Sequence, residues 1–484
     1  MTYPPQHQSR LFIGGEWVDP LSTTTIDVVE AHSEHVIGRV PEAGTADVDA
    51  AVSAARDAFD RSDWPHRPLT DRMAAVQRII DEFGGRAEEM ARTISSENGA
   101  PIKFSRLGQV GAPLDIMASC IDVAAAVPWE ERRPGRYLDY LVRREPVGVV
   151  GAIVAWNVPQ VLIAVKLAPA LLAGCTVVIK AAPEASLDAM LLAQILEAAD
   201  LPRGTVSVLT GGVEAGRALA GHPGVDKISF TGSTAAGREI GAQCGRNLRR
   251  CSLELGGKSA AILLDDADLA SAAQALRFTS FVNNGQACAA QTRILAPRSR
   301  YAEAVDAIGA LAASLTVGDP HDPDTKIGPL VSSRQRERVR GYIEAGRAEG
   351  ARLVTGGPEA PDGLSAGWFV QPTVFADVDN GMRIAQEEIF GPVLSVIPYD
   401  DDADAVSLAN DSRYGLAGSV FTSDPERGLA VARSVRTGTF GINGYAPDPM
   451  APFGGFKESG IGREWGRYGL DEYVEIKAVN GLPL

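Results

Sequence analysis

The residues in this sequence with the clearest chemical potential are a cysteine and a glutamate. Cys288 lies in FVNNGQACAAQ, among small and polar residues that suit an accessible site better than a hydrophobic core. Glu254 ends the apolar stretch CSLEL, and burial at such a strand end is expected to raise its pKa into the range of a general base. The two residues together predict a thiol nucleophile with a base. The commoner roles for such residues are a buried structural cysteine and a glutamate that caps the next element.

Other kinds of cysteine chemistry find little support. A Cys–His hydrolase needs a histidine partner, but no histidine lies in a recognisable motif (His7, His32, His35, His66, His222 and His321). Five cysteines without a CxxC pair give no expectation of a disulfide framework or a metal site, and they favour a reducing cytoplasm. The N-terminal MTYPPQHQSR reads as a short polar arm without the apolar core of a secretory signal.

Length, composition and charge restrict the class of protein. A chain of 484 residues is too long for one hydrophobic core, so we expect two or three domains. An apolar share of 45% and a charged share of 22% are typical of a soluble globular protein. The net charge of -15 argues against nucleic acid as a partner, because binding to phosphates requires a basic surface.

One apolar stretch, residues 147–165, resembles a membrane span in length. Asn157, Pro159 and Gln160 interrupt its middle, and polar groups at that depth in lipid are costly. We therefore expect a buried strand, a turn and a buried helix, and no membrane partner.

From this stretch onward, apolar strands alternate with helices. The pattern predicts a doubly wound parallel sheet, in which ligands bind at the carboxyl ends of the strands. That rule selects five positions along the chain: Trp156–Asn157, Lys180, Gly211–Gly212, Thr231–Gly232–Ser233 and Glu254–Leu255–Gly256.

A glycine loop, GSTAAG, occupies one of these strand ends, at Gly232 to Gly237. It matches neither the dinucleotide fingerprint GxGxxG nor the phosphate-binding P-loop. A helix N-terminus after a strand still offers free N–H groups to a phosphate. From the loop alone, a phosphate site and an ordinary turn are equally good interpretations.

Several motifs together identify a family. AWNVP, FTGST, LELGGKS, GQACA, EEIFGPV and PFGGFKESGIGRE resemble those of the NAD(P)-dependent aldehyde dehydrogenase superfamily, and the resemblance covers nearly the whole chain. It implies that Cys288 attacks the aldehyde, that the Asn157 amide and the Cys288 backbone N–H hold the oxyanion, and that Glu254 activates water to hydrolyse a thioester. It also implies a set of cofactor-binding residues: Trp156, Lys180, Gly232, Ser233, Thr234, Gly237, Leu255, Glu388 and Phe390.

Two positions depart from the family pattern. Members usually carry a glutamate three residues after the cofactor lysine, where this chain has Pro183, with Glu184 next. This leaves NADP open, but NAD is expected because KAAPEAS contains no arginine to hold a second phosphate. At Val158 many relatives have an aromatic residue, so a wider substrate tunnel is expected.

The resemblance implies three parts and an α/β fold: a Rossmann-like cofactor domain, an α/β catalytic domain and a small β oligomerisation flap. We place the cofactor domain at residues 1–120 and 142–254, the catalytic domain at 255–443, and the bridging segments at 121–141 and 444–484. Because exposed edge strands are best covered by another subunit, a homodimer or homotetramer is expected.

The reaction expected is oxidation of an aldehyde to the carboxylic acid with NAD⁺. A largely apolar pocket favours a medium aliphatic or aromatic aldehyde, and its expected lining residues are Val158, Leu162, Phe281, Ala287, Ala289, Tyr445 and Phe453. Three alternatives stay open: an NADP-preferring semialdehyde dehydrogenase, a CoA-acylating relative, which Glu254 disfavours, and a non-catalytic protein on the same scaffold.

Overall fold

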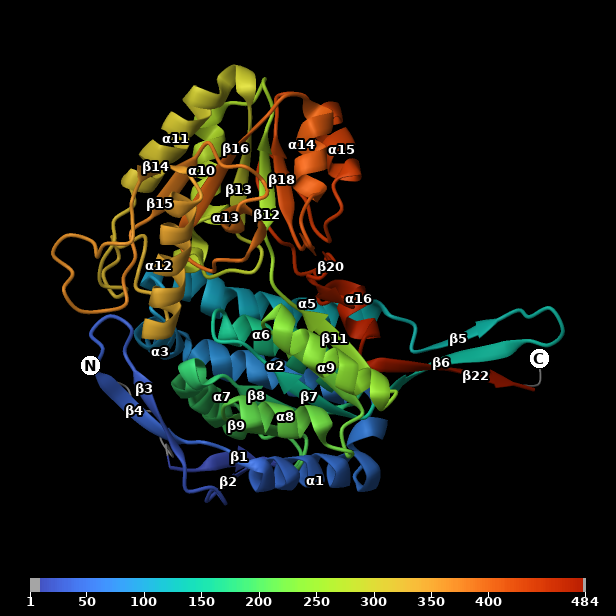
Figure 1. Ribbon diagram of the computed structural model, residues 1–484. Helices are drawn as coiled ribbons and strands as arrows, with labels where there is room; N and C mark the ends of the chain where they lie inside the picture. The colour runs from blue at the N-terminus through green and yellow to red at the C-terminus, as the bar shows by residue number, and fades with distance from the viewer. Residues whose placement is uncertain (1–8, 482–484) are drawn as a thin grey trace.

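The computed structural model describes residues 9–481, which form two α/β lobes and a projecting three-stranded sheet (Figure 1). Most of the predicted N-terminal arm, residues 1–8, lies outside the described residues.

The first lobe contains the predicted doubly wound sheet, which is confirmed. Its five central strands run parallel, with the antiparallel β1–β2 hairpin at one edge and the short antiparallel β21 at the other. In sheet order the strands are β2 (Glu16–Val18), β1 (Leu11–Ile13), β9 (Val206–Thr210), β8 (Thr176–Ala181), β7 (Val149–Ile153), β10 (Lys227–Thr231), β11 (Arg250–Glu254) and β21 (Gly460–Ile461).

Helices cover both faces of this sheet, so its central strands are largely buried and have apolar side chains on both faces. Along β8, Val177 and Ile179 belong to one hydrophobic cluster and Val178 to another on the opposite face, as the alternation of side chains along a strand requires. One face carries α2 (Leu69–Gly85), α3 (Ala87–Asn98), α5 (Ala112–Ala126), α6 (Pro159–Ala173) and α7 (Ser186–Ala198); the other carries α1 (Thr45–Arg61), α8 (Val213–Gly221) and α9 (Thr234–Arg246). The strand–turn–helix expected for residues 147–165 is confirmed as β7 followed by α6.

The second lobe is a seven-stranded sheet that is parallel except for β14 at its edge. In sheet order its strands are β14 (Arg352–Thr355), β15 (Thr373–Ala376), β16 (Val393–Tyr399), β13 (Gln291–Pro297), β12 (Ser259–Leu263), β18 (Gly418–Phe421) and β19 (Gly441–Ile442). Its helices are α10 (Leu269–Thr279), α11 (Tyr301–Ala313), α12 (Ser333–Ala348), α13 (Arg383–Gln386), α14 (Asp402–Asn410) and α15 (Pro425–Ser434). Cys288 lies just before the central strand β13.

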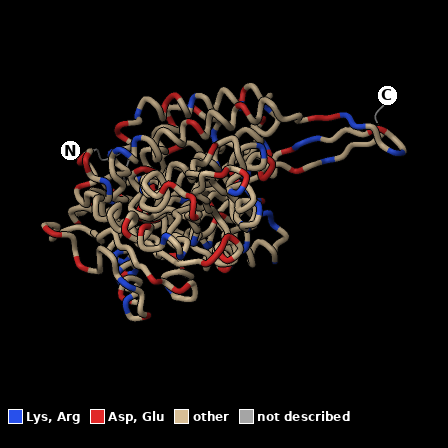
Figure 2. Tube along the Cα trace, turned by 90° about the horizontal axis from the view of Figure 1, so that it is seen from above, with Lys and Arg blue, Asp and Glu red and all other residues tan. Residues whose placement is uncertain are grey.

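The projecting sheet consists of β5 (Glu130–Arg133), β6 (Tyr140–Pro146) and β22 (Val474–Asn480), which pair antiparallel. Both views show it extending away from the lobes, and Figure 2 shows charges of both signs along it. Cross-strand pairs such as Arg143 with Glu130 (3.0 Å) account for part of this pattern.

The bridging segments that we expected from the sequence are too wide. Residues 121–126 continue helix α5, and β6 extends past residue 141 to Pro146. From the C-terminal segment, β21 joins the first sheet and β20 (Phe456–Lys457) pairs with β17 (Tyr414–Gly415), so only β22 belongs to the projecting sheet. The apolar residues of α5, such as Val123 and Ala124, belong to the first lobe's core.

Smaller elements complete the chain: β3 (Thr25–Val29), β4 (Val36–Pro41), α4 (Ile102–Phe104), a π-helical segment at Ser105–Gly111, α16 (Gly466–Asp471), and the short 3₁₀ helices η1 (Trp64–His66), η3 (Pro183–Ala185), η4 (Val282–Gly285) and η5 (Arg298–Arg300). None of the helices in residues 9–481 is long and apolar enough to cross a membrane.

One buried arginine, five residues after Cys288, joins several segments of the second lobe through hydrogen bonds. The Arg293 guanidinium, on β13, donates to the carbonyls of Lys258 (3.0 Å), Leu408 (2.8 Å) and Ala409 (2.9 Å). The last two end helix α14, where a positive charge also favours the helix dipole.

We expect Arg293→Met to lower the free energy of unfolding by about 3 kcal/mol, because it leaves buried carbonyls without donors. Urea unfolding followed by tryptophan fluorescence measures the change. Arg298→Met is the control: Arg298 forms an exposed pair with Asp400 (2.6 Å), which should contribute about 1 kcal/mol or less. Equal shifts in the two variants would contradict this role of Arg293.

Candidate active site

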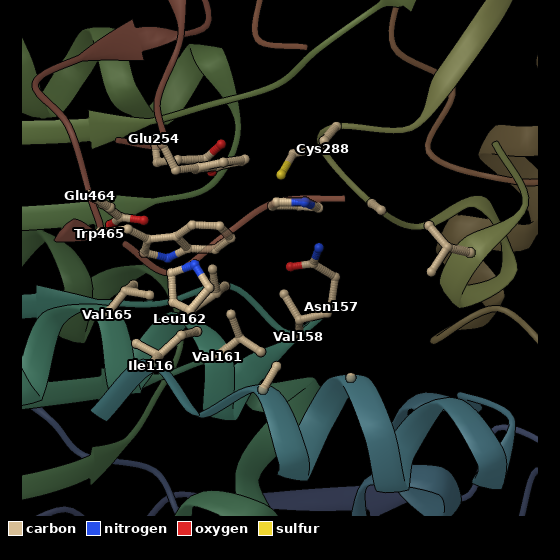
Figure 3. Close-up of a pocket in the computed structure, with 18 of the residues that line it drawn as sticks. Ile116, Asn157, Val158, Val161, Leu162, Val165, Glu254, Cys288, Glu464 and Trp465 are labelled. Atoms are coloured by element: carbon tan, nitrogen blue, oxygen red, sulfur yellow. The ribbon is translucent and has the colours of Figure 1, made fainter. Parts of the chain in front are cut away.

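Three residues far apart in the sequence converge where the two lobes meet. Glu254 ends β11, Asn157 lies in the turn between β7 and α6, and Cys288 lies between η4 and β13. All three line both of two adjoining cavities, of about 400 and 450 Å³. Figure 3 shows the Cys288 sulfur pointing into the space between the Glu254 carboxylate and the Asn157 amide.

Side-chain amides hold the loop before Cys288. Asn283 and Asn284 both have left-handed backbone (φ 51° and 60°), a conformation that asparagine tolerates better than most residues. The Asn284 amide donates to the carbonyls of Gly99 (3.0 Å) and Pro329 (2.9 Å). The loop is therefore tied both to the first lobe and to the segment before α12.

Asn157 is fixed through both its side chain and its backbone. Its Nδ2 donates to the carbonyl of Gln286 (3.0 Å), which uses one of its two N–H bonds. Its own carbonyl accepts from the amides of Asn283 (2.8 Å), Gln109 (3.0 Å) and Asn98 (3.3 Å). The remaining N–H of the Asn157 side chain is free to act in the cavity.

Glu254 is a buried carboxyl group, only 4% exposed. Neither of its carboxyl oxygens has a hydrogen-bond partner among residues 9–481. Burial, followed by the charge of Glu464, raises its pKa well above the usual range, while Lys166 and Cys288 oppose the shift. A carboxylate with a raised pKa and unsatisfied oxygens is suited to taking a proton from water or a thiol.

Cys288 is a half-buried residue. Burial raises its pKa well above that of an ordinary thiol, and the charges of Glu254 and Glu388 raise it further. The backbone N–H of Ala289 opposes these effects. The sulfur is therefore protonated at neutral pH and needs a base before it can act as a nucleophile.

A second buried carboxylate, Glu464, lies beside Glu254 and was not predicted as a site residue. Its Oε1 lies 2.5 Å from the Nζ of the fully buried Lys166, which also donates to Thr231 Oγ1 (2.7 Å). Glu464 belongs to the predicted PFGGFKESGIGRE motif, but only the fold brings it to the cavity.

The 450 Å³ cavity contains most of the residues that the resemblance assigns to a cofactor. Trp156, Gly232, Ser233, Leu255, Glu388 and Phe390 line it. The rings of Trp156 and Phe390 meet edge to face at 5.4 Å. Glu388 accepts from the Gly257 N–H (2.9 Å), and a Cβ at Gly256 would lie 2.6 Å from the Glu388 carboxylate. Glycine at 256 keeps this part of the cleft open.

Lys180 lines a third cavity, of about 290 Å³, on the same side of the sheet. Its Nζ donates to the Gly211 carbonyl (3.1 Å), and burial lowers its pKa to about 8. Arg334 lines both this cavity and the 450 Å³ cavity, so the two cavities lie next to each other.

Arginines from other elements reach the third cavity, although KAAPEAS itself contains none. Arg334 comes from α12 and pairs with Glu184 (3.2 Å), while Arg217 comes from α8 and pairs with Glu214 (3.1 Å) and Glu239 (2.9 Å). Neighbouring sequence could not show them because they lie on other elements. Both already have carboxylate partners.

Two of the predicted cofactor residues line neither cavity. Thr234 begins α9, and its buried Oγ1 has no hydrogen-bond partner within the described chain. A Cβ at Gly237 would lie 2.5 Å from a methyl carbon of Leu255, so this glycine lets α9 approach β11. Ser233 lines the cleft and also caps α9 by accepting from the Ala236 N–H (3.3 Å).

The 400 Å³ cavity on the other side of Cys288 is mainly apolar. Val158, Leu162, Ala287, Ala289, Tyr445 and Phe453 line it as predicted. Phe281 does not: it belongs to the second lobe's core, and Phe278 and Val282 line the cavity instead. The left-handed loop at Asn283 and Asn284 makes the register of this segment hard to predict.

Helix α12 also contributes to the cleft and was not predicted to do so. Arg334, Gln335 and Arg338 line the 450 Å³ cavity, and Arg338 donates to the Glu388 carbonyl (2.6 Å). Basic residues repeat along this helix, but nothing in the sequence connects it to the cleft.

Comparisons with known proteins agree with this geometry. A model of the aldehyde dehydrogenase family matches residues 17–479. A geranial dehydrogenase from Castellaniella defragrans is 46% identical over 480 residues, which cover 99% of each chain.

Solved structures are similar over the same extent. An aldehyde dehydrogenase from Mycobacterium tuberculosis complexed with NAD⁺ has a TM-score of 0.96 and 50% identity, with 98% of each chain covered. A variant of aldehyde dehydrogenase C from Pseudomonas syringae, in complex with NAD⁺ and octanal, has a TM-score of 0.96 and 41% identity, covering 99% of this chain and 98% of that one.

The charges around Cys288 predict its reactivity. In the unmodified protein, the pH midpoint of Cys288 alkylation by iodoacetamide should lie above the ordinary thiol value of about 8.5. In Glu254→Gln the midpoint should fall, because the neighbouring negative charge is removed. Peptide mass spectrometry follows Cys288 alone, and Glu475→Gln on the projecting sheet is the control. A midpoint that is unchanged or higher in Glu254→Gln would contradict the conclusion that the charge of Glu254 raises the pKa of Cys288.

Proposed function

This chain belongs to the aldehyde dehydrogenase family, and on that premise we propose that it oxidises an aldehyde through a thioester on Cys288. The observation that carries the proposal is the position of Cys288, Asn157 and Glu254 at the junction of an apolar cavity and a polar cleft. A substrate that enters through the apolar cavity can place its carbonyl group beside the Cys288 sulfur, and a cofactor in the polar cleft can approach the same carbonyl carbon.

The first step joins the Cys288 sulfur to the carbonyl carbon of the aldehyde. As the C–S bond forms, the carbonyl electrons move to oxygen, and the free N–H of the Asn157 side chain stabilises the oxyanion. Glu254, with its raised pKa, takes the thiol proton. When the oxyanion collapses, hydride leaves the carbon and a thioester remains on Cys288.

Glu254 then acts on water. After it has released the thiol proton to solvent, the carboxylate removes a proton from water while the water oxygen attacks the thioester carbon. The C–S bond then breaks, the sulfur leaves as a thiolate, and the carboxylic acid is released. A carboxylate at this position favours water over a bulkier thiol acceptor such as CoA.

The cleft residues fit a nicotinamide dinucleotide, which supplies the hydride acceptor when bound. Lys180, whose Nζ has only the Gly211 carbonyl as a hydrogen-bond acceptor among the described residues, would hold the adenosine ribose. Ser233 at the N-terminus of α9 would meet the pyrophosphate. Glu388 would hold the second ribose, with Phe390 and Trp156 beside the nicotinamide.

We favour NAD over NADP as the cofactor. Arg334 and Arg217 line the third cavity, but each pairs with a glutamate whose negative charge disfavours an additional phosphate there. The relatives solved with NAD⁺ support this choice.

The substrate that suits the 400 Å³ cavity is a neutral apolar aldehyde of medium length. Val158, just before helix α6, and Val161, Leu162 and Val165 within it line the cavity, and no lysine, arginine or histidine among residues 9–481 lines it. An anionic semialdehyde would therefore have no partner for its carboxylate. A geranial dehydrogenase and an octanal complex among the relatives agree with this class.

We also propose a homodimer or homotetramer in the cytoplasm. The projecting sheet has an exposed edge strand and exposed apolar side chains such as Ile476, which another copy would cover. The cysteines are all free, as a reducing compartment requires.

Rapid mixing tests the roles of Cys288 and Glu254. With aldehyde and NAD⁺, Glu254→Gln should form about one equivalent of NADH per site, more slowly than the unmodified protein because the thiol has lost its base. Turnover should then stop or slow at least 100-fold, because general-base catalysis of hydrolysis contributes about 10²–10⁴ in rate. Cys288→Ala should give neither burst nor turnover while still binding NADH. Sustained oxidation by Cys288→Ala would show that the nucleophile is assigned wrongly.

An aldehyde panel with both cofactors tests substrate and cofactor together. We expect kcat/KM to rise from propanal to octanal, because each buried CH₂ adds about 0.8 kcal/mol, and to be lowest for succinic semialdehyde. NAD⁺ should outperform NADP⁺ throughout. The absorbance of the reduced cofactor gives both results, and preference for the semialdehyde or for NADP⁺ would overturn them.

A further inference from the structure

One segment of the substrate cavity's wall has an unusual backbone. Residues 105–111 are π-helical and lie between α4 and α5. Such segments are rare and frequently occur at functional sites, because the wider turn redirects side chains. Neither the sequence motifs nor the proposed mechanism involves this segment.

Two consecutive residues of the segment face different parts of the site. Gly108 lines the apolar cavity, together with Phe104 and Ala112. Gln109 is completely buried, and its Nε2 donates to the backbone carbonyl of Asn157 at 3.0 Å. Its Oε1 is buried and has no hydrogen-bond partner among residues 9–481. The side chain therefore has one hydrogen bond in this structure, and that bond is to Asn157.

The Asn157 carbonyl depends on few strong donors. A carbonyl oxygen offers two lone pairs, and three amides approach it. The amide of Asn98 is the most distant (3.3 Å) and is shared with the Trp156 carbonyl (3.4 Å). Asn283 (2.8 Å) and Gln109 (3.0 Å) remain as the two close donors. Asn283 belongs to the cysteine loop, whereas Gln109 belongs to the wall of the substrate cavity.

We propose that Gln109 is a positioning residue that orients Asn157 for oxyanion binding. Its hydrogen bond fixes the orientation of the peptide group between Asn157 and Val158. That orientation, together with the hydrogen bond from the Asn157 side chain to the Gln286 carbonyl, determines where the free N–H of the Asn157 side chain points. The inference rests on the proposed role of Asn157 in the mechanism. A small change in the direction of this N–H weakens a bond that matters only when charge develops on the substrate oxygen.

The test is a reaction of Cys288 that forms an oxyanion without a cofactor. Acetyl transfer from p-nitrophenyl acetate to the thiol passes through a tetrahedral oxyanion and releases nitrophenolate, whereas alkylation by iodoacetamide forms none. Gln109→Met removes the amide with little change in volume. It should slow acylation about tenfold and leave the alkylation rate within twofold.

Two further variants make the result specific. Asn157→Ala should slow acylation at least as much as Gln109→Met, and adding Gln109→Met to it should slow acylation no further, because residues that act through one bond are not additive. Gln77→Met, on the exposed face of α2 where Gln77 bonds Asp81 (2.8 Å), is the matched control and should change neither rate.

The possible outcomes separate this inference from the proposed function. Slow acylation in Asn157→Ala with normal acylation in Gln109→Met overturns the role of Gln109 alone. Normal acylation in both variants overturns the oxyanion assignment and the inference together. Equal losses of acylation and alkylation in Gln109→Met would mean that it only supports the fold, and would also overturn the inference.

Discussion

The site depends on a set of side-chain amides that hold an irregular loop in place between two lobes. Asn283 and Asn284 have left-handed backbone, a conformation with a free-energy cost that their hydrogen bonds to Asn157, Gly99 and Pro329 offset. Gln286 extends the set: its carbonyl accepts from Asn157, and its Oε1 accepts from the Val331 N–H (3.1 Å). Asn157 and the loop that carries Cys288 are thus parts of one hydrogen-bonded unit, although they adjoin strands of different sheets.

Burial then determines how the charged groups behave. Glu254 and Cys288 both have raised pKa values, because burial disfavours the charged form of each. In the proposed mechanism the ionised Glu254 takes a proton first from the thiol and later from water, beside the mainly apolar wall of the substrate cavity. The same low polarity that raises these pKa values also strengthens the interaction of the Asn157 amide with an oxyanion.

Much of this arrangement could be predicted from the sequence, because some signals are local. Alternating apolar strands and helices predict the first sheet, and strand ends indicate Asn157, Lys180 and Glu254. The remaining features depend on contacts between distant segments. Arg334 and Arg338 reach the cleft from α12, Glu464 reaches Glu254 from a loop near the C-terminus, and Gln109 reaches Asn157 from the π-helical segment. Phe281 was misplaced because a left-handed turn follows it.

The central claim is that the aldehyde carbon becomes bonded to Cys288 as a thioester, which is hydrolysed by water that Glu254 activates. Intact-mass measurement of Glu254→Gln after mixing with NAD⁺ and octanal tests it most directly. The account predicts one added octanoyl group per chain, lost with hydroxylamine and absent when Cys288 is also replaced by alanine. An unmodified mass under conditions in which NADH has formed, or an octanoyl group on any other residue, would contradict the account.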